Sequence, residues 1–214
     1  MSGVVGKWGK WVGQMLKGYD ELPFGFYEWT LVGHLAIAAG RLGYYVLQEY
    51  PVERKVGAHN GPKRPRADLY VRTCRHDYVF EVKHVYIELG SGKTAVEKEI
   101  KEPLEQARNK LYRYSGAAKH RCSMVVASIL MKPDDWENKY VNRNSYLRAH
   151  EKLADDLRCL LRNLRPSVAN YCGGFLCSHK EARNEYKKGS RQGWNPIVGF
   201  VFLGRVKRSK SRRG

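Results

Sequence analysis

The stretch "RPRADLYVRTCRHDYVFEVKH", residues 64–84, contains two β-prone runs that carry charged side chains where buried strands carry apolar ones. The runs at 67–72 and 78–87 are rich in Val, Tyr and Phe, and the polar segment "TCRHD" separates them. Alternation of this kind on either side of a short polar segment predicts a β-hairpin.

Three charged side chains of this hairpin are expected to meet on one face. Side chains alternate between the faces of a strand, so Glu81 and Lys83 point the same way, with backbones about 7 Å apart. Pairing of the two runs brings Asp68 beside Glu81. Two carboxylates next to an ammonium form a cation site: Mg²⁺ binds a few carboxylate oxygens and keeps several waters, and a nearby lysine can act on a water that attacks phosphorus.

The alternative is that these charges are structural. Asp68 would then cap a turn, and Glu81 and Lys83 would form an ion pair on a solvated face. The segment "YVFEVKHVYI" is apolar on both sides of the charges, which disfavours a merely solvated face.

The sequence before the hairpin predicts a helix, a glycine stop at 40–43 and a strand, followed by the basic loop "KVGAHNGPKRPR". Glu28 shares the apolar face of this helix with Val32 and Leu35, and a carboxylate on a buried face needs a partner or a metal. Glu28 is therefore a candidate third ligand.

The sequence after the hairpin predicts an amphipathic helix within 91–116 and a strand, "CSMVVASILM", buried on both faces. Pro103 either kinks that helix or begins a second one. The predicted order is α-β-β-β-α-β, an α/β fold with a mixed central sheet.

A C-terminal extension of one helix and two strands is expected beyond this core. Asn144 or Ser145 is expected to cap the helix, which ends before Pro166, and the strands at 168–177 and 197–203 flank a polar loop. The domain boundaries that follow are an N-terminal amphipathic segment at 1–23, a domain at 24–204 with its core at about 24–131, and a basic tail at 205–214.

The net charge of +18 favours polyanionic partners, nucleic acid first and anionic membrane second. No apolar run is long enough to span a membrane. Five cysteines without a disulfide spacing indicate a reducing, cytoplasmic location. The candidate nucleic-acid contacts lie in the basic loop and the tail: Lys63, Arg64, Arg66, Lys207, Arg208, Lys210, Arg212 and Arg213.

The helix residue Glu28, "PRAD" ending in Asp68, "EVK" at 81–83 and the predicted element order together resemble the PD-(D/E)xK nuclease superfamily, which includes restriction endonucleases and archaeal Holliday-junction resolvases. The resemblance covers about 24–131. The proline stands three residues before Asp68 instead of next to it, and Lys110 stands where some branches carry tyrosine.

This resemblance implies a restriction-endonuclease-like fold and a catalytic role for Asp68, Glu81, Lys83 and Glu28. Asp68, Glu81, Val82 and Glu28 would provide the metal site for Mg²⁺ or Mn²⁺, and Lys83 would assist the nucleophilic water.

The expected function is that of a metal-dependent endonuclease that hydrolyses phosphodiester bonds in DNA. The alternatives are a Holliday-junction resolvase and a catalytically silent nucleic-acid-binding module of the same fold. DNA is the expected partner, and a second copy of the chain, forming a homodimer, is the other partner considered.

Overall fold

A computed structural model of the chain describes residues 28–54, 66–115, 120–163, 171–192 and 197–208. The N-terminal segment at 1–23, the loop residues Lys63 and Arg64, and residues 209–214 of the basic tail lie outside the described residues. Within them, no helix is both long enough and apolar enough to cross a membrane.

The predicted order of the core is confirmed. Helix α2 (Glu28–Gly40) is followed by strands β1 (Tyr45–Pro51), β3 (Arg66–Arg72) and β4 (Asp77–Glu88), then by helix α3 (Lys93–Tyr112) and strand β6 (His120–Leu130). The short strands β2 (Glu53–Arg54) and β5 (Tyr114–Ser115), which the sequence did not indicate, pair with each other as a separate ribbon.

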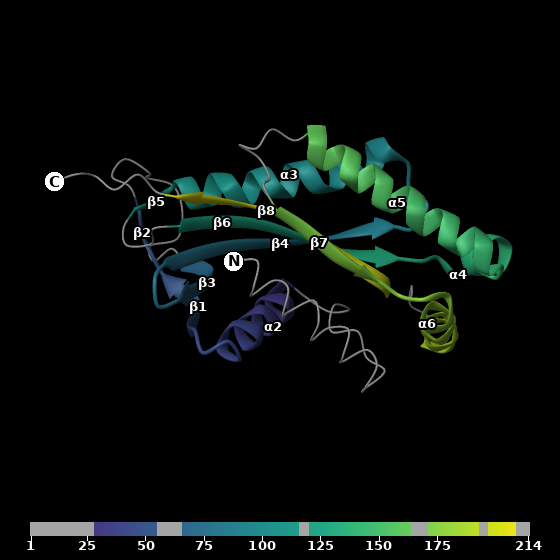
Figure 1. Cartoon of the computed structure of the whole chain (residues 1–214), viewed down its shortest axis with the longest axis horizontal. Coiled ribbons are helices and arrows are strands. Elements are labelled where there is room, and N and C mark those ends of the chain that lie inside the picture. Colours follow the sequence, from purple (N-terminus) through teal and green to yellow (C-terminus); the bar gives the residue numbers. More distant parts are fainter. Residues whose placement is uncertain (1–27, 55–65, 116–119, 164–170, 193–196, 209–214) are drawn as a thin grey trace.

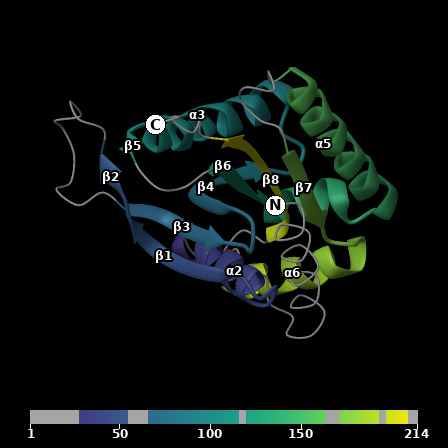
Figure 2. The same ribbon diagram turned by 60° about the vertical axis from the view of Figure 1, so that its left-hand side comes forward.

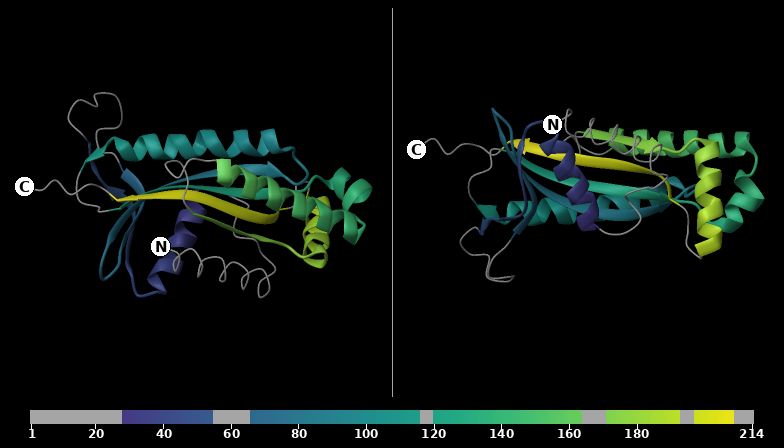
Figure 3. Two further views of the ribbon diagram at one scale, coloured as in Figure 1. Left: turned by 45° about the horizontal axis from the view of Figure 1, so that its top comes forward. Right: turned by 90° about the horizontal axis from the view of Figure 1, so that it is seen from below.

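The main sheet is mixed and has six strands in the order β1-β3-β4-β6-β8-β7, where β7 is Tyr171–Leu176 and β8 is Ile197–Arg208. Strands β4 and β6 are parallel and are joined by α3, as a parallel crossover requires; every other neighbouring pair in this sheet is antiparallel. Helix α3 lies along one face together with α5 (Arg143–Asn163), and α2 lies on the other face (Figures 1 and 3).

Helix α2 begins at Glu28 and buries an apolar stripe that includes Leu31, Leu35 and Ala39. The helix ends at Gly40, and Gly43 adopts a φ of +75°, a left-handed conformation that glycine reaches without strain. The chain then turns into β1, which pairs with β3 beside it (Figure 2). This turn joins the end of α2 to the edge strand of the sheet, next to the hairpin of β3 and β4.

Helix α3 is one continuous helix with Pro103 inside it, so the prediction that Pro103 could begin a second helix is wrong. Its buried side chains, Val96, Ile100, Leu104, Ala107 and Leu111, recur at helical spacing and face the sheet. That stripe is long enough to hold the helix together where the proline removes a backbone hydrogen bond.

The C-terminal extension differs from the prediction in its helices. The side chain of Asn142, not of Asn144 or Ser145, accepts the N-terminal hydrogen bond of α5, from Asn144 N–H at 2.8 Å. The predicted polar loop contains helix α6 (His179–Gln192). Its start is a capping box, in which Ser178 N–H donates to Glu181 at 2.7 Å and Glu181 N–H donates to Ser178 Oγ at 3.3 Å.

Strand β8 is longer than predicted. It pairs with β6 as far as His120 and Arg208, so the part of the expected basic tail at 205–208 is strand. The physical reason is that the whole of β6 from His120 onward offers backbone groups on that side, and β8 satisfies them. This places Arg205 and Lys207 on the sheet.

Candidate functional site

The site forms where strands β3 and β4 separate. Their ladder ends at the pair Leu69 and Phe80, after which β3 continues beside β1 and β4 continues beside β6. The next residue of β3 is Asp68, and its Oδ2 accepts a hydrogen bond of 2.7 Å from Val82 N–H. The Asp68 carboxylate thus accepts from Val82 N–H, a backbone group that would have donated to a carbonyl oxygen of β3 if the pairing of β3 with β4 had continued.

Glu28 makes a similar contact two residues further along β4. Its Oε2 accepts from His84 N–H at 3.4 Å, and its Oε1 accepts from the Lys83 ammonium at 3.0 Å. Carboxylates from β3 and from the first turn of α2 therefore satisfy two alternate N–H groups of the same strand. The four residues of the sequence motif, Glu28, Asp68, Glu81 and Lys83, are brought together.

The C-terminal end of α3 and the strand β5 that follows it add two residues that the sequence prediction missed, Lys110 and Tyr114. The Lys110 ammonium contacts Glu81 Oε1 and lies 3.7 Å from Asp68 Oδ1. The Tyr114 hydroxyl donates to the Arg66 carbonyl oxygen at 2.9 Å and lies 3.3 Å from Glu81 Oε2. A signal was present for Lys110, which follows the buried Ala107 by three residues and so lies beside it on the helix, whereas Tyr114 lies beyond the helix on β5.

Glu81 is the most constrained group of the site. Its side chain is fully buried, and its two oxygens face Lys110, Tyr114 and, at 3.8 Å, the Lys83 ammonium. Burial and then the neighbouring charge of Asp68 raise the pKa of Glu81 to about 7, although both lysines act in the opposite direction. The two lysines therefore offset only part of the free-energy cost of removing the ionised Glu81 carboxylate from water.

Asp68 and Lys110 are shifted by the same cluster. Burial raises the pKa of Asp68 despite the Val82 hydrogen bond and the charge of Lys110. Burial by itself lowers the pKa of Lys110, but its hydrogen bond to Glu81 and the charges of the acids around it outweigh that effect and raise it. A positive charge near Asp68 and Glu81 therefore stabilises their ionised forms, and Lys110 provides part of that charge.

A divalent cation fits the donor chemistry of Asp68 and Glu81. Among the described residues no group of three or more His, Cys, Asp or Glu side chains is placed to hold a metal ion, so a third protein carboxylate is not shown. Two carboxylates with bound waters are nevertheless a usual set for Mg²⁺, and a cation would offset the burial of both acids. The Lys110 ammonium would have to leave Glu81 Oε1 for the ion to bind there.

The other two predicted ligands have different contacts. The oxygens of Glu28 are directed at Lys83 and at the backbone of His84, and Val82 contributes its N–H to Asp68. A direct contact from either residue to a metal stays a prediction.

The predicted nucleic-acid contacts fall in several places. Arg66 is exposed at the start of β3, with its guanidinium 3.9 Å from Glu49. Lys207 is exposed on β8, and Arg208 ends that strand. Five others lie outside the described residues: Lys63, Arg64, Lys210, Arg212 and Arg213.

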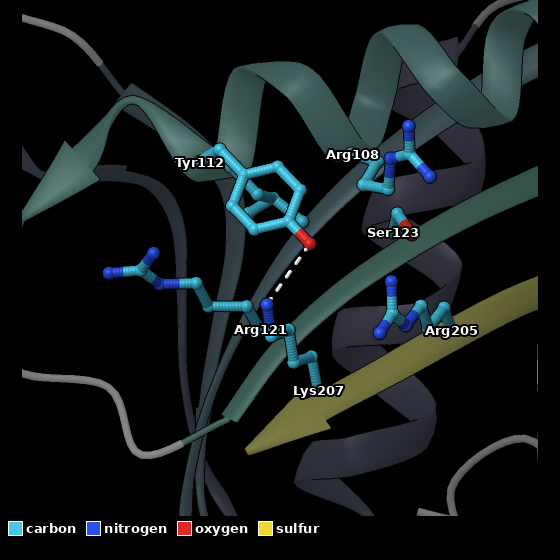
Figure 4. A pocket seen from close by; sticks show the side chains of 7 residues that line it. Arg108, Tyr112, Arg121, Ser123, Arg205 and Lys207 are labelled. Carbon is cyan, nitrogen blue, oxygen red and sulfur yellow. Dashed lines mark hydrogen bonds between the residues drawn. The ribbon is translucent and has the colours of Figure 1, made fainter. Parts of the chain in front are cut away.

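A basic pocket missed by the sequence analysis lies beside the site, between α3 and strands β6 and β8 (Figure 4). Its lining residues are Arg108, Leu111, Tyr112, Arg121, Ser123, Arg205 and Lys207. The sequence offers no periodic signal for it, because its cations come from three separate segments. No protein-family model, no curated protein and no solved structure matches this chain.

Proposed function

We propose that this chain is a divalent-metal-dependent nuclease that hydrolyses phosphodiester bonds in DNA and acts as an endonuclease. The observation that supports this most is the meeting of Asp68, Glu81 and Lys83 at the point where β3 and β4 separate. The resemblance of these residues to the PD-(D/E)xK motif adds a second argument. The choice of DNA over RNA as the substrate rests on that resemblance alone.

Each residue of the site has a distinct task in this proposal. Asp68 and Glu81 hold Mg²⁺ or Mn²⁺, which supplies Lewis acidity at the phosphate and lowers the pKa of a bound water. Lys83 has its ammonium 3.8 Å from Glu81 and donates hydrogen bonds to the attacking water or to a phosphate oxygen. Glu28 holds the Lys83 ammonium in place through the 3.0 Å contact.

The restriction-endonuclease-like fold belongs to the same proposal. The order α2-β1-β3-β4-α3-β6 and the parallel pair β4 and β6 are compatible with that core. The same core serves Holliday-junction resolvases, so a junction is the alternative DNA substrate.

One observation favours a catalytically silent binding module instead. The Lys110 ammonium contacts Glu81 and lies 3.7 Å from Asp68, so the protein itself places a positive charge between the two proposed ligands. In a silent module this contact would be permanent, and the basic surface would hold nucleic acid without cleaving it.

Cleavage that depends on a metal separates the two functions. Purified protein is incubated with supercoiled plasmid, linear single strands, RNA and a four-way junction, each with Mg²⁺, with Mn²⁺ and with chelator. We expect nicked or linear plasmid only when the metal is present. The matched control is a protein with Asp155→Asn, a loss of one exposed acid on α5, which should cleave like the unchanged protein.

Absence of cleavage on all four substrates with either metal, from protein that still binds DNA in a gel-shift titration, would favour the silent module. Cleavage of the junction alone would favour the resolvase.

A further inference from the structure

The basic pocket between α3, β6 and β8 has a lining suited to an anion. Arg108, Arg121, Arg205 and Lys207 contribute four cationic side chains, and the lining residues include no carboxylate. Like charges at such proximity repel one another, and an anion that enters the pocket removes that repulsion.

Sheet register explains why these cations gather. Arg121 of β6 is paired with Lys207 of β8, and Ser123 of β6 is paired with Arg205 of β8. Residues two apart on a strand share a face, and directly paired residues of antiparallel strands also share one. Both pairs therefore lie on the face that α3 covers, below Arg108 and Tyr112.

The cationic side chains of the pocket use only some of their N–H groups in contacts within the protein, so other N–H groups can donate to a ligand. Lys207 donates to the Tyr112 hydroxyl oxygen at 3.1 Å and lies 4.7 Å from the centre of its ring. The Nη2 of Arg121 donates to the Tyr114 carbonyl oxygen at 2.9 Å, which uses one of its five N–H groups. Arg108 has a buried Nε with no hydrogen-bond partner among the described residues, and its Nη2 lies 3.8 Å from Glu105.

Tyr112 is set up as a hydrogen-bond donor. Hydrogen bonds from Lys207 and then Arg205 lower the pKa of its hydroxyl. Because these cations donate to the oxygen, the hydroxyl hydrogen is left for an acceptor in the pocket, where Figure 4 shows the ring above Arg121 and Lys207.

The pocket and the site of Asp68 and Glu81 share one row of the sheet. Glu81 of β4 is paired with Ser123 of β6, which in turn is paired with Arg205 of β8. Two strand spacings separate Glu81 from Arg205, a backbone distance of about 10 Å. A nucleic-acid strand that passes Asp68 and Glu81 along this row therefore also passes the pocket.

We propose that the pocket formed by Arg108, Tyr112, Arg121, Arg205 and Lys207 binds a phosphate group of a nucleic-acid strand, close along that strand to the phosphate at Asp68 and Glu81. The second half of this statement rests on the proposed nuclease function, whereas phosphate binding does not. Guanidinium groups bind phosphate oxygens in pairs, which suits a pocket with three arginines.

The phosphate can be an internal phosphodiester or a terminal monophosphate, and binding experiments separate these sources. The variant R205Q/K207Q removes two pocket charges, and the control R183Q/K187Q removes two exposed charges from α6 at the other end of the sheet (Figure 1). The charge-retaining variant R205K/K207R tests whether the fold tolerates substitution. Fluorescence anisotropy in chelator measures affinity for a single-stranded decamer with and without a 5′-phosphate.

We expect R205Q/K207Q to bind at least tenfold more weakly, and the control and R205K/K207R to stay within about threefold of the unchanged protein. The slope of log K against log salt should fall by about 0.7, the value for one phosphate contact to a single strand, in R205Q/K207Q only. Loss of affinity confined to the 5′-phosphorylated decamer identifies a terminal phosphate, and equal loss for both decamers identifies an internal one.

Equal weakening in R205Q/K207Q and R183Q/K187Q would overturn the proposal, because charge alone would then explain binding. Because these measurements contain no metal, failure of the nuclease proposal leaves their outcome unchanged. If the unchanged protein cleaves DNA and the two double variants bind alike, the nuclease stands and the pocket does not.

Discussion

Glu28 and Lys83 lie 55 positions apart in the chain, and their side chains form a hydrogen bond of 3.0 Å. The same glutamate accepts from His84 N–H, so it fixes the start of α2 against β4 as well as the ammonium of Lys83. A residue that holds another in place should matter less than the residue it holds.

Glu28→Gln should therefore reduce cleavage by about tenfold, and Lys83→Ala by at least a hundredfold. Glutamine keeps one oxygen, which can accept from Lys83 or from His84 N–H but not from both as the two carboxylate oxygens do, and it loses the negative charge. Both groups of the ion pair are partly exposed, so the free energy of unfolding should fall by only about 0.5–1 kcal/mol in Glu28→Gln. Single-turnover cleavage and urea unfolding measure the two effects, and equal losses of activity would contradict the positioning role.

Asp68→Asn should lower the cleavage rate by at least a hundredfold and leave DNA binding intact. Asparagine can still accept the Val82 N–H bond through its side-chain oxygen, so the hairpin is retained, but it lacks the charge that a divalent cation needs. A gel-shift titration in Ca²⁺ beside a cleavage assay in Mg²⁺ separates binding from chemistry. Cleavage at the unchanged rate would remove Asp68 from the site.

The pKa of Glu81 predicts how the metal-free protein responds to pH. Because burial and Asp68 raise the pKa of Glu81 to about 7 in the folded protein, above its value near 4.5 when unfolded, the stabilising contribution is complete below about pH 4.5 and is lost as the pH rises through 7. In chelator the free energy of unfolding should therefore fall between pH 5 and pH 8, by an amount on the order of 2 kcal/mol.

The control for this trend is Glu81→Gln, which lacks the titrating carboxylate at position 81. In this variant the free energy of unfolding should fall much less between pH 5 and pH 8. Half-buried His150, whose pKa is lowered by burial to about 4, contributes a slope of opposite sign toward acid, but it is present in both proteins and cancels in their difference. Urea unfolding at a series of pH values measures the difference, and parallel curves would count against the assignment.

The sequence was sufficient to predict the site's central residues and the core of the fold. Glu81 and Lys83 alternate within a strongly apolar strand, and Asp68 precedes them in a strand of the same hairpin, so a local pattern was enough to place all three. The same holds for α3, whose apolar spacing is regular enough to predict a helix despite Pro103.

What the sequence could not show depends on contacts between distant segments. Lys110 reaches Glu81 because α3 crosses over β4, and the basic pocket needs the register of β6 against β8. Helix α6 was missed because it is strongly charged and, among those of its side chains that the structure describes, only Ala182 is buried, although the capping box of Ser178 and Glu181 was a local signal of its start.

Lys110→Gln should make the folded protein more dependent on metal. Without the ammonium, buried Glu81 loses its nearest positive charge, so the metal-free protein at pH 8 should lose about 1–2 kcal/mol, less than the roughly 3–5 kcal/mol for a fully buried pair because Lys110 is 43% exposed. A cation held by Asp68 and Glu81 would restore that loss by binding only the folded state.

Thermal unfolding with and without Mg²⁺ at pH 8 is the measurement. We expect the shift in Tm caused by Mg²⁺ to be larger in Lys110→Gln than in the unchanged protein. The matched control is Lys187→Gln on α6, an exposed lysine far from the site, for which the shift should not change. No shift by Mg²⁺ in any of the three proteins would support the silent binding module.

Two truncations should separate the charge of the C-terminal residues from the stability that β8 provides. Removing 209–214 takes away Lys210, Arg212 and Arg213, so DNA affinity should fall and its dependence on salt should weaken, with Tm unchanged within about 1 °C. Removing 206–214 also deletes the pairing of Val206 with Cys122 and of Lys207 with Arg121 in the ladder of β8 with β6.

Val206 is partly buried against the main core, so the longer truncation should lower Tm by several degrees, about 1–2 kcal/mol for a chain of this size. It should also weaken DNA binding more than the shorter one, because Lys207 belongs to the basic pocket. Differential scanning fluorimetry and a salt series of binding titrations test both expectations. Equal Tm values for the two truncations would mean that the end of β8 adds no stability. Arg205 would then be held in the pocket without any contribution from the pairing of the residues that follow it.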